Sequence, residues 1–167
     1  MAIPKHKSQR VAVLIDPQNM YHSAKNIYKA RTNFKEILKA AVAGRQLIRA
    51  IAYVIKTETG EEKPFFEALS KMGIELKIKD LQVFPGGMKK GDWDVGMTID
   101  AVRLADLAID AIVLITGDGD FVPLVEYLKL KGLQVEVAAF GKSTSAKLKE
   151  VADDFIDLGE NPKRFLI

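Results

Sequence analysis

Two continuous apolar runs organise the chain, "VAVLID" at 11–16 and "AIVLIT" at 111–116. Both are rich in β-branched side chains, and neither alternates apolar with polar residues as a half-exposed strand does. Uninterrupted runs of this length are typical of strands that are buried on both faces of a parallel sheet. The pattern therefore predicts two central parallel strands.

The remaining segments alternate between strand-like and helix-like patterns. A long helical segment at 18–43 is predicted to contain two helices, with a break near Arg31-Thr32-Asn33. The alternation predicts one α/β domain over 1–167 with a mainly parallel sheet and right-handed crossovers. Further strands are predicted at 46–55, 74–84, 134–140 and 154–158 (the last at an edge), further helices at 61–73, 94–108, 121–132 and 143–153, and a glycine-rich loop at 84–94.

The residues that end the two central strands are polar. The first strand ends at Asp16, and the strand at 111–116 leads into Thr116-Gly117-Asp118-Gly119-Asp120. In open α/β sheets, ligands bind beyond the carboxyl ends of the strands, where the strand order reverses. If the two strands are neighbours, three carboxylates converge on one crevice.

Asp16 opens the motif "DPQN" and has two interpretations. An aspartate followed by proline is a common helix start, in which the carboxylate caps the helix. Alternatively, Asp16 binds a hard cation, and Asn19, one turn later, holds a water or a phosphate oxygen. The motif alone favours neither interpretation.

Asp118 and Asp120 can likewise be explained as turn and cap residues, because aspartate and glycine suit tight turns. Two carboxylates so close in sequence repel one another, however, and a cation removes that repulsion. Mg²⁺ and Mn²⁺ prefer carboxylate and water oxygens. The segment lacks both the G-x-G-x-x-G pattern of dinucleotide sites and the G-K-[ST] of a P-loop.

The helix predicted at 94–108 carries Asp94, Asp100 and Asp106 at six-residue spacing. Six residues turn a helix by about 600°, so successive aspartates lie ~120° apart and cannot share one face. Asp94 fits a helix start, and Asp106 a solvated surface. Asp100 is the best candidate for a helix carboxylate that reaches the strand ends, although a surface pair with Arg103 would also explain it.

Three residues outside the strand ends are candidate ligand contacts. Lys90, in the loop before this helix, either is solvated or binds a substrate phosphate. Trp93 is expected to pack under the loop, with stacking on a base as the alternative. Ser143 fits a helix start first and a phosphate contact second.

Composition narrows the chemistry. The absence of cysteine excludes disulfides, thiolate zinc sites and cysteine nucleophiles, and two histidines are too few and scattered for a histidine-based metal site. The net charge of +3 is only a weak basic bias. With no apolar h-region of a signal peptide and no apolar run of the ~20 residues that a membrane span needs, we expect a soluble cytoplasmic protein without membrane contact.

Together, the motifs "LIDPQNM", "KKGDWDVGMTIDAVRLA", "AIVLITGDGDFVPLVEYLKLKGLQVEVAAF" and "STSAKLKEVADDFIDL" resemble the LabA-like branch of the NYN domain family, within the PIN-like superfamily of metal-dependent nucleases. The resemblance spans about Val11 to Leu158. It implies a PIN-like fold of three layers (α/β/α), with a mainly parallel sheet of five or six strands in the order 3-2-1-4-5, which places the two central strands side by side. It also implies an acidic site at Asp16, Asp100, Asp118 and Asp120, supported by Asn19 and Thr116, with Lys90 and Asp94 matching loop positions.

The expected function is an endoribonuclease that hydrolyses RNA, preferentially single-stranded, with Mg²⁺ or Mn²⁺ held by the four aspartates. The alternative is a PIN-like module that binds RNA or a protein partner without cutting. A haloacid-dehalogenase phosphatase is disfavoured because Gln18 stands where its second aspartate is needed, and a toprim-like site because it would need Glu at Asp16. The sequence leaves a homodimer open.

Overall fold

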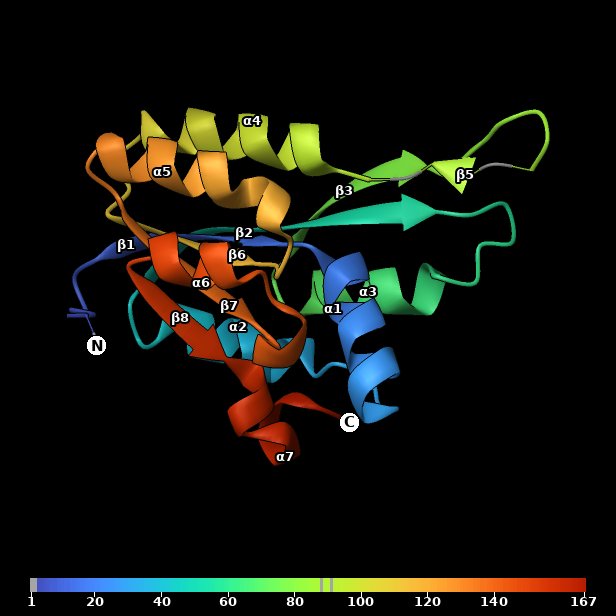
Figure 1. The fold of residues 1–167 in the computed structure, drawn as a ribbon, viewed down its shortest axis with the longest axis horizontal. Coiled ribbons are helices and arrows are strands. Elements are labelled where there is room, and N and C mark those ends of the chain that lie inside the picture. Colours follow the sequence, from blue (N-terminus) through green and yellow to red (C-terminus); the bar gives the residue numbers. More distant parts are fainter. Residues whose placement is uncertain (1–2, 88, 91) are drawn as a thin grey trace.

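The computed structural model describes residues 3–87, 89–90 and 92–167. A central sheet of six parallel strands runs through it in the order β3-β2-β1-β6-β7-β8 (Figure 1). The predicted parallel sheet of five or six strands is confirmed. Numbered without the small ribbon described below, these strands follow the order 3-2-1-4-5-6, so the expected 3-2-1-4-5 is extended by one edge strand. The strands are β1 (Arg10–Ile15), β2 (Gln46–Lys56), β3 (Glu75–Asp80), β6 (Ala111–Ile115), β7 (Gln134–Ala139) and β8 (Asp154–Asp157).

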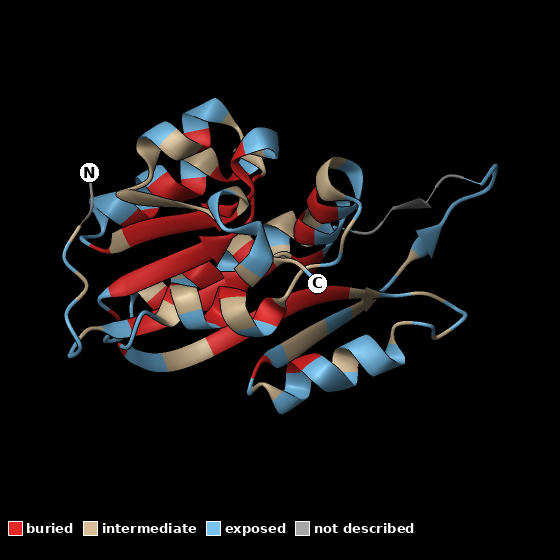
Figure 2. Ribbon diagram, turned by 90° about the horizontal axis from the view of Figure 1, so that it is seen from below, coloured by how far each residue is buried: buried red, intermediate tan, exposed pale blue. Residues whose placement is uncertain are grey.

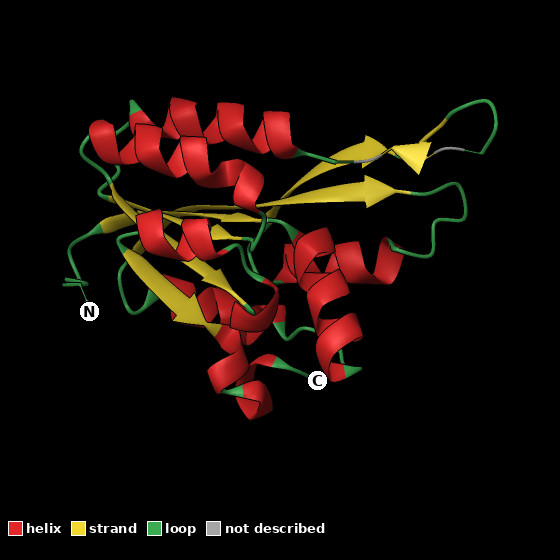
Figure 3. Ribbon diagram, viewed as in Figure 1, coloured by secondary structure: helices red, strands yellow, loops and turns green. Residues whose placement is uncertain are grey.

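Helices cover both faces of the sheet, which gives the predicted three layers (Figure 3). One apolar cluster joins the sheet to α1 (Pro17–Ser23), the π-helix η1 (Ala24–Tyr28), α2 (Phe34–Val42), α3 (Lys63–Lys71) and α7 (Pro162–Phe165). A second cluster, on the opposite face, joins it to α4 (Asp94–Ala105), α5 (Val122–Leu130) and α6 (Ala146–Val151). Three single turns complete the elements: η2 (Gly119–Phe121), η3 (Gly141–Ser143) and η4 (Leu158–Glu160).

The central strands are buried on both faces, as their apolar runs predict. Along β1, Val13 and Ile15 pack into the first cluster, whereas Ala12 and Leu14 pack into the second, and all four are fully buried. Figure 2 shows this buried centre between exposed helix surfaces. β1 pairs with β6 from Val11 opposite Ala111 to Ile15 opposite Ile115. The two strands therefore end side by side.

Two local features refine the predicted elements. The break expected near 31–33 is real: Lys29 adopts a left-handed backbone conformation that ends η1, and Asn33 caps α2 by accepting a hydrogen bond from the Glu36 N–H. The predicted glycine-rich loop contains β5 (Lys89–Lys90), which pairs antiparallel with β4 (Gln82–Val83) just before the loop. This ribbon extends past the ends of β2 and β3 (Figure 1).

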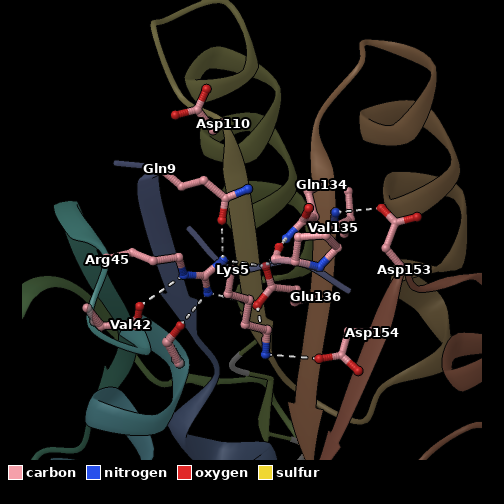
Figure 4. A network of polar contacts seen from close by, with 12 residues as sticks. Lys5, Gln9, Val42, Arg45, Asp110, Gln134, Val135, Glu136, Asp153 and Asp154 are labelled. Atoms are coloured by element: carbon pink, nitrogen blue, oxygen red, sulfur yellow. Dashed lines mark hydrogen bonds and ion pairs between the residues drawn. The ribbon is translucent and has the colours of Figure 1, made fainter. Parts of the chain in front are cut away.

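A buried ion pair lies where β7 begins (Figure 4). The guanidinium of Arg45 donates two hydrogen bonds to the Glu136 carboxylate, at 2.8 and 2.9 Å, and both side chains are fully buried. Lys5 in the N-terminal segment lies 3.5 Å from the same carboxylate and 2.9 Å from Asp154 of β8. The network thus ties the N-terminal segment, the end of α2 and two strands together, far along the strands from the residues that follow β1 and β6.

In the part of the chain that the structure describes, no helix has the length and apolar composition needed to cross a membrane.

Candidate metal centre

Asp16 follows β1 and caps α1, which is one of the two interpretations that its motif left open. Its Oδ1 accepts a hydrogen bond from the Asn19 N–H at 3.2 Å, and Pro17 occupies the first helical position. Its Oδ2 accepts a second bond, at 3.1 Å, from the hydroxyl of Thr116, which follows the neighbouring strand β6. The cap therefore leaves the Asp16 carboxylate directed towards the end of β6.

Thr116 and Asn19 connect the two strand ends. The fully buried Thr116 hydroxyl also accepts from the Asp118 N–H at 3.2 Å. The side-chain oxygen of Asn19 accepts from the Gly117 N–H at 2.8 Å. Asp118 in turn caps the turn η2 by accepting from the Asp120 N–H at 2.9 Å. Capping and turn roles are thus real for these residues, and they also fix where the carboxylates lie.

The glycines of "TGDGD" allow the next loop to approach closely. A Cβ on Gly117 would lie 2.8 Å from the Thr144 hydroxyl and 3.2 Å from the Thr144 Cα, and a Cβ on Gly119 would lie 2.8 Å from the Ser145 hydroxyl. The Ser145 N–H bonds the Gly117 carbonyl at 3.1 Å. Small residues alternate with the aspartates because this loop packs against the turn that presents them.

Three carboxylates meet at this end of the sheet: Asp94, Asp118 and Asp120 each offer one oxygen, and the three oxygens lie within 4.8 Å of one another. We call these residues the acidic triad. Oxygen ligands that share one Mg²⁺, Mn²⁺ or Ca²⁺ ion, at metal–oxygen distances of about 2.0–2.6 Å, lie no more than about 5 Å apart. The triad therefore has the donor type and the spacing of a hard-cation site.

Two triad residues, Asp94 and Asp118, line a cleft of about 230 Å³. Asp16, Asp92, Asp94 and Asp118 all line it, so one wall is strongly negative. The pKa of Asp94 is raised to about 6, first by burial and then by the charges of Asp118, Asp92, Asp16 and Asp120. Burial, followed by the charges of Asp118 and Asp92, likewise raises the pKa of Asp16 against the effect of its two hydrogen bonds. A bound cation would relieve this repulsion.

Asp100 does not join this group. Its Oδ2 accepts a hydrogen bond from the Tyr53 hydroxyl at 2.8 Å and lies 2.6 Å from the Lys77 ammonium. Burial alone would raise the pKa of Asp100, but the bonds from Lys77 and Tyr53 outweigh it and hold the pKa below its usual value. Asp94 and Asp100 are separated by about 9 Å along the helix and ~120° around it. Asp94 faces the strand ends, and Asp100 faces β2 and β3.

The remaining predicted contact residues are Lys90, Ser143 and Trp93, and the outcome differs for each. The prediction for Lys90 concerns a side chain outside the described part of the structure. The Ser143 hydroxyl bonds Ser23 at 2.8 Å. Trp93 packs on β2, with its ring centroid 5.5 Å from that of Tyr53, and it also borders the cleft.

Asp92, Tyr53 and His22 line the cleft, although the sequence did not predict them as site residues. Asp92 was overlooked although the loop "GDWD" places it two residues before Asp94. Tyr53 looks like an ordinary aromatic residue within a buried strand, and no local signal marks it. The sequence excluded His22 only from a histidine-based metal site. In the structure, its exposed side chain lines the cleft.

Known proteins that are similar to this chain match it over nearly its whole length. The family model of the NYN domain matches residues 10–159. An uncharacterized protein of Methanocaldococcus jannaschii is 31% identical over 155 residues, which cover 90% of this chain and 56% of that protein. The chain thus spans little more than half the length of this relative. The low amplitude and bright protein LabA of Synechococcus elongatus is 24% identical over 92% of this chain and 86% of its own length.

A solved structure supports the fold. The crystal structure of a protein of unknown function from Vibrio parahaemolyticus superposes with a TM-score of 0.87 at 30% sequence identity, covering 99% of this chain and all of that one.

Proposed function

The chain belongs to the NYN domain family, and on this basis we propose that it is a metal-dependent ribonuclease that hydrolyses RNA at the acidic triad. The observation that carries the proposal is the convergence of carboxylate oxygens of Asp94, Asp118 and Asp120 within 4.8 Å, at a cleft that Asp94 and Asp118 line together with Asp16. Like charges brought so close destabilise a fold unless something compensates them. The family resemblance supplies the class of reaction, and the cleft supplies a place for it.

The donor set fits Mg²⁺ or Mn²⁺. All four acids offer carboxylate oxygens, which hard cations prefer, and the chain has no cysteine that would select a softer metal. When bound, such a cation lowers the pKa of a coordinated water and neutralises the charge that develops on the leaving oxygen. Asp94, Asp118 and Asp120 would hold it.

The surrounding residues orient the reacting groups. Asp16 is fixed by bonds from Thr116 and the Asn19 backbone, so its charge stays beside the triad. The Asn19 side-chain oxygen is used by the Gly117 N–H, which fixes the amide plane. Its NH₂ group, a double donor, is then available to a phosphate oxygen in the cleft that Asn19 lines.

Lysine side chains lie near the cleft, and their positive charges suit a polyanionic substrate such as RNA. Lys79 lies 4.8 Å from the ring centroid of Trp93, a cleft residue. Lys25 lies 5.6 Å from the ring of Tyr21, which contacts the cleft residue His22. Lysines at such positions can contact backbone phosphates on either side of a scissile bond, as a flexible single strand requires.

Cleavage of end-labelled single-stranded RNA, with and without Mn²⁺ or Mg²⁺, tests the proposal. The wild-type protein should cut only with the cation, and Asp118→Asn should abolish cutting while its circular dichroism spectrum is unchanged. Asp106→Asn is the matched control, because Asp106 ends α4 at the surface beside Lys131 and should leave cleavage intact. RNA binding without cleavage by the wild type would overturn the proposal in favour of a regulatory binding module.

A further inference from the structure

Trp93, the only tryptophan of the chain, immediately precedes Asp94 and is held by two strands. Its indole N–H donates to the Val54 carbonyl of β2 at 2.9 Å, and its ring lies beside that of Tyr53, also on β2. Lys79 of β3 lies 4.8 Å from the ring centroid, and its ammonium donates to the Asp92 carbonyl at 2.6 Å. The chain entering α4 is therefore attached to the sheet through the Trp93 side chain.

Gly96 lets the Trp93 ring pack directly on the first turn of α4. A Cβ at position 96 would lie 2.5 Å from Cε3 and 2.8 Å from Cζ3 of the indole. Those distances are far below van der Waals contact, so any larger residue would push the ring away. The ring thus contacts the turn that carries Asp94.

Among the described residues, few capping hydrogen bonds support the start of α4. Trp93 is its N-cap residue and makes no side-chain capping bond, and the Asp94 N–H bonds only weakly, at 3.3 Å, to the Asp92 carboxylate. The first turn of a helix frays when its N–H groups are poorly capped. Packing of the indole therefore takes over the role of a cap in fixing Asp94.

Asp100 reaches the same ring indirectly. Its carboxylate accepts from the hydroxyl of Tyr53, which is 2% exposed, and from Lys77 of β3. These bonds fix the phenol, and the phenol ring packs against the indole. A continuous chain of contacts thus runs from Asp100 through Tyr53 and Trp93 to the turn that carries Asp94.

We propose that Trp93 is a positioning residue for the Asp94 carboxylate, and that Asp100 acts on the cation site through Tyr53 and Trp93 and does not ligate the ion. The inference rests on the proposed function, because positioning Asp94 matters only if Asp94 binds the cation. Residues that orient a metal ligand typically change metal affinity about 10- to 100-fold when altered.

Calorimetric titration with Mn²⁺ alone, on the full chain, tests the positioning role. Gly96→Ala and Trp93→Ala should each weaken Mn²⁺ binding at least ~10-fold, and Trp93→Phe, which keeps a ring, should recover part of that loss. Val95→Ala is the control, since Val95 lies on the same turn but is 70% exposed. Unchanged Mn²⁺ affinity in Gly96→Ala and Trp93→Ala, even with lowered melting temperatures, would show a merely structural role and overturn the inference.

Asp100→Asn separates the indirect role from ligation. It should weaken Mn²⁺ binding without changing the number of ions bound, and, like Tyr53→Phe, it should shift Trp93 fluorescence to longer wavelength and expose the indole to acrylamide quenching. Asp106→Asn, on the same helix, should do neither. Loss of a bound ion from Asp100→Asn with unaltered Trp93 emission would identify Asp100 as a ligand and contradict the proposal.

The Mn²⁺ titration of the wild-type protein distinguishes a failure of the proposed function from a failure of this inference. A wild-type protein that binds no Mn²⁺ would overturn the proposed function and this inference together. A wild type that binds Mn²⁺ as tightly as Gly96→Ala and Trp93→Ala would overturn the inference alone.

Discussion

The Thr116 hydroxyl donates a hydrogen bond to the Asp16 carboxylate at 3.1 Å across the ends of β6 and β1. The two residues are 100 positions apart in sequence, yet both follow central strands in register. The same hydroxyl accepts a hydrogen bond from the Asp118 N–H. One buried oxygen therefore fixes both Asp16, which follows β1, and Asp118, which follows β6.

Thr116→Val should therefore lower the free energy of unfolding by about 1–2 kcal/mol, because Asp16 loses a donor and the Asp118 N–H loses its acceptor. Mn²⁺ affinity should fall as well, since the turn that bears Asp118 is loosened. Urea denaturation and calorimetry measure the two effects. Thr98→Val, at a partly exposed position of α4, should leave both unchanged.

Asp94 should make stability depend on pH when no cation is present. Its pKa in the fold is about 6, above the ordinary 3.8, so the fold holds the proton more tightly than the unfolded chain does. Stability should thus be highest below pH ~4 for this group and fall as the pH rises to about 6. In EDTA, Asp94→Asn should raise the free energy of unfolding by about 1 kcal/mol at pH 7.5, a value reduced for solvent screening, and change it little at pH 4. Equal effects at both pH values would contradict the assignment.

The affinity for Mn²⁺ should also depend on the ionisation of Asp94. Asp94 must lose its proton to serve as a ligand, so the apparent Mn²⁺ affinity should drop about tenfold per pH unit below ~6 and level off above it. Calorimetric titrations from pH 5 to pH 8 measure this dependence. Affinity that stays constant across this range would argue against Asp94 as a ligand.

The buried pair of Arg45 and Glu136 should dominate stability at the other end of the sheet. Glu136→Gln leaves the Arg45 guanidinium without its compensating charge and should cost about 3–5 kcal/mol. Lys5→Ala, whose side chain is partly exposed, should cost about 1 kcal/mol or less. Denaturant midpoints report both changes. At a temperature where Glu136→Gln remains folded, its Mn²⁺ affinity should equal that of the wild type.

Most of the fold could be predicted from the apolar pattern. The runs at 11–16 and 111–116 coincide with β1 and β6 to within one residue, and the edge strand expected at 154–158 is β8 at Asp154–Asp157. The ribbon of β4 and β5 could not be predicted, because two-residue strands have no periodicity. The π-helical turn η1 was missed for a similar reason, since it continues the helical pattern of α1.

The candidate site could be predicted only in part. Asp16 and Asp118 follow apolar strands, and that position alone indicates the end of the sheet where they lie. The choice between Asp94 and Asp100 depends on how α4 is rotated against the sheet. That rotation follows from the burial of Met97, Ala101 and Leu104 in the second cluster and from the contacts of Trp93 and Asp100 with β2 and β3, which join positions distant in sequence. The assignment of the ligands stays a prediction until a cation is measured.

The Arg45–Glu136 network and the acidic triad lie at opposite ends of the same strands, and this separation has an evolutionary consequence. Mutations can remove carboxylates from the acidic triad while the Arg45–Glu136 network and the apolar core continue to specify the fold. Replacing Asp94 is even expected to increase stability when no cation is present. A lineage built on this scaffold can therefore lose the proposed cation site, and any cleavage that depends on it, without passing through an unfolded intermediate.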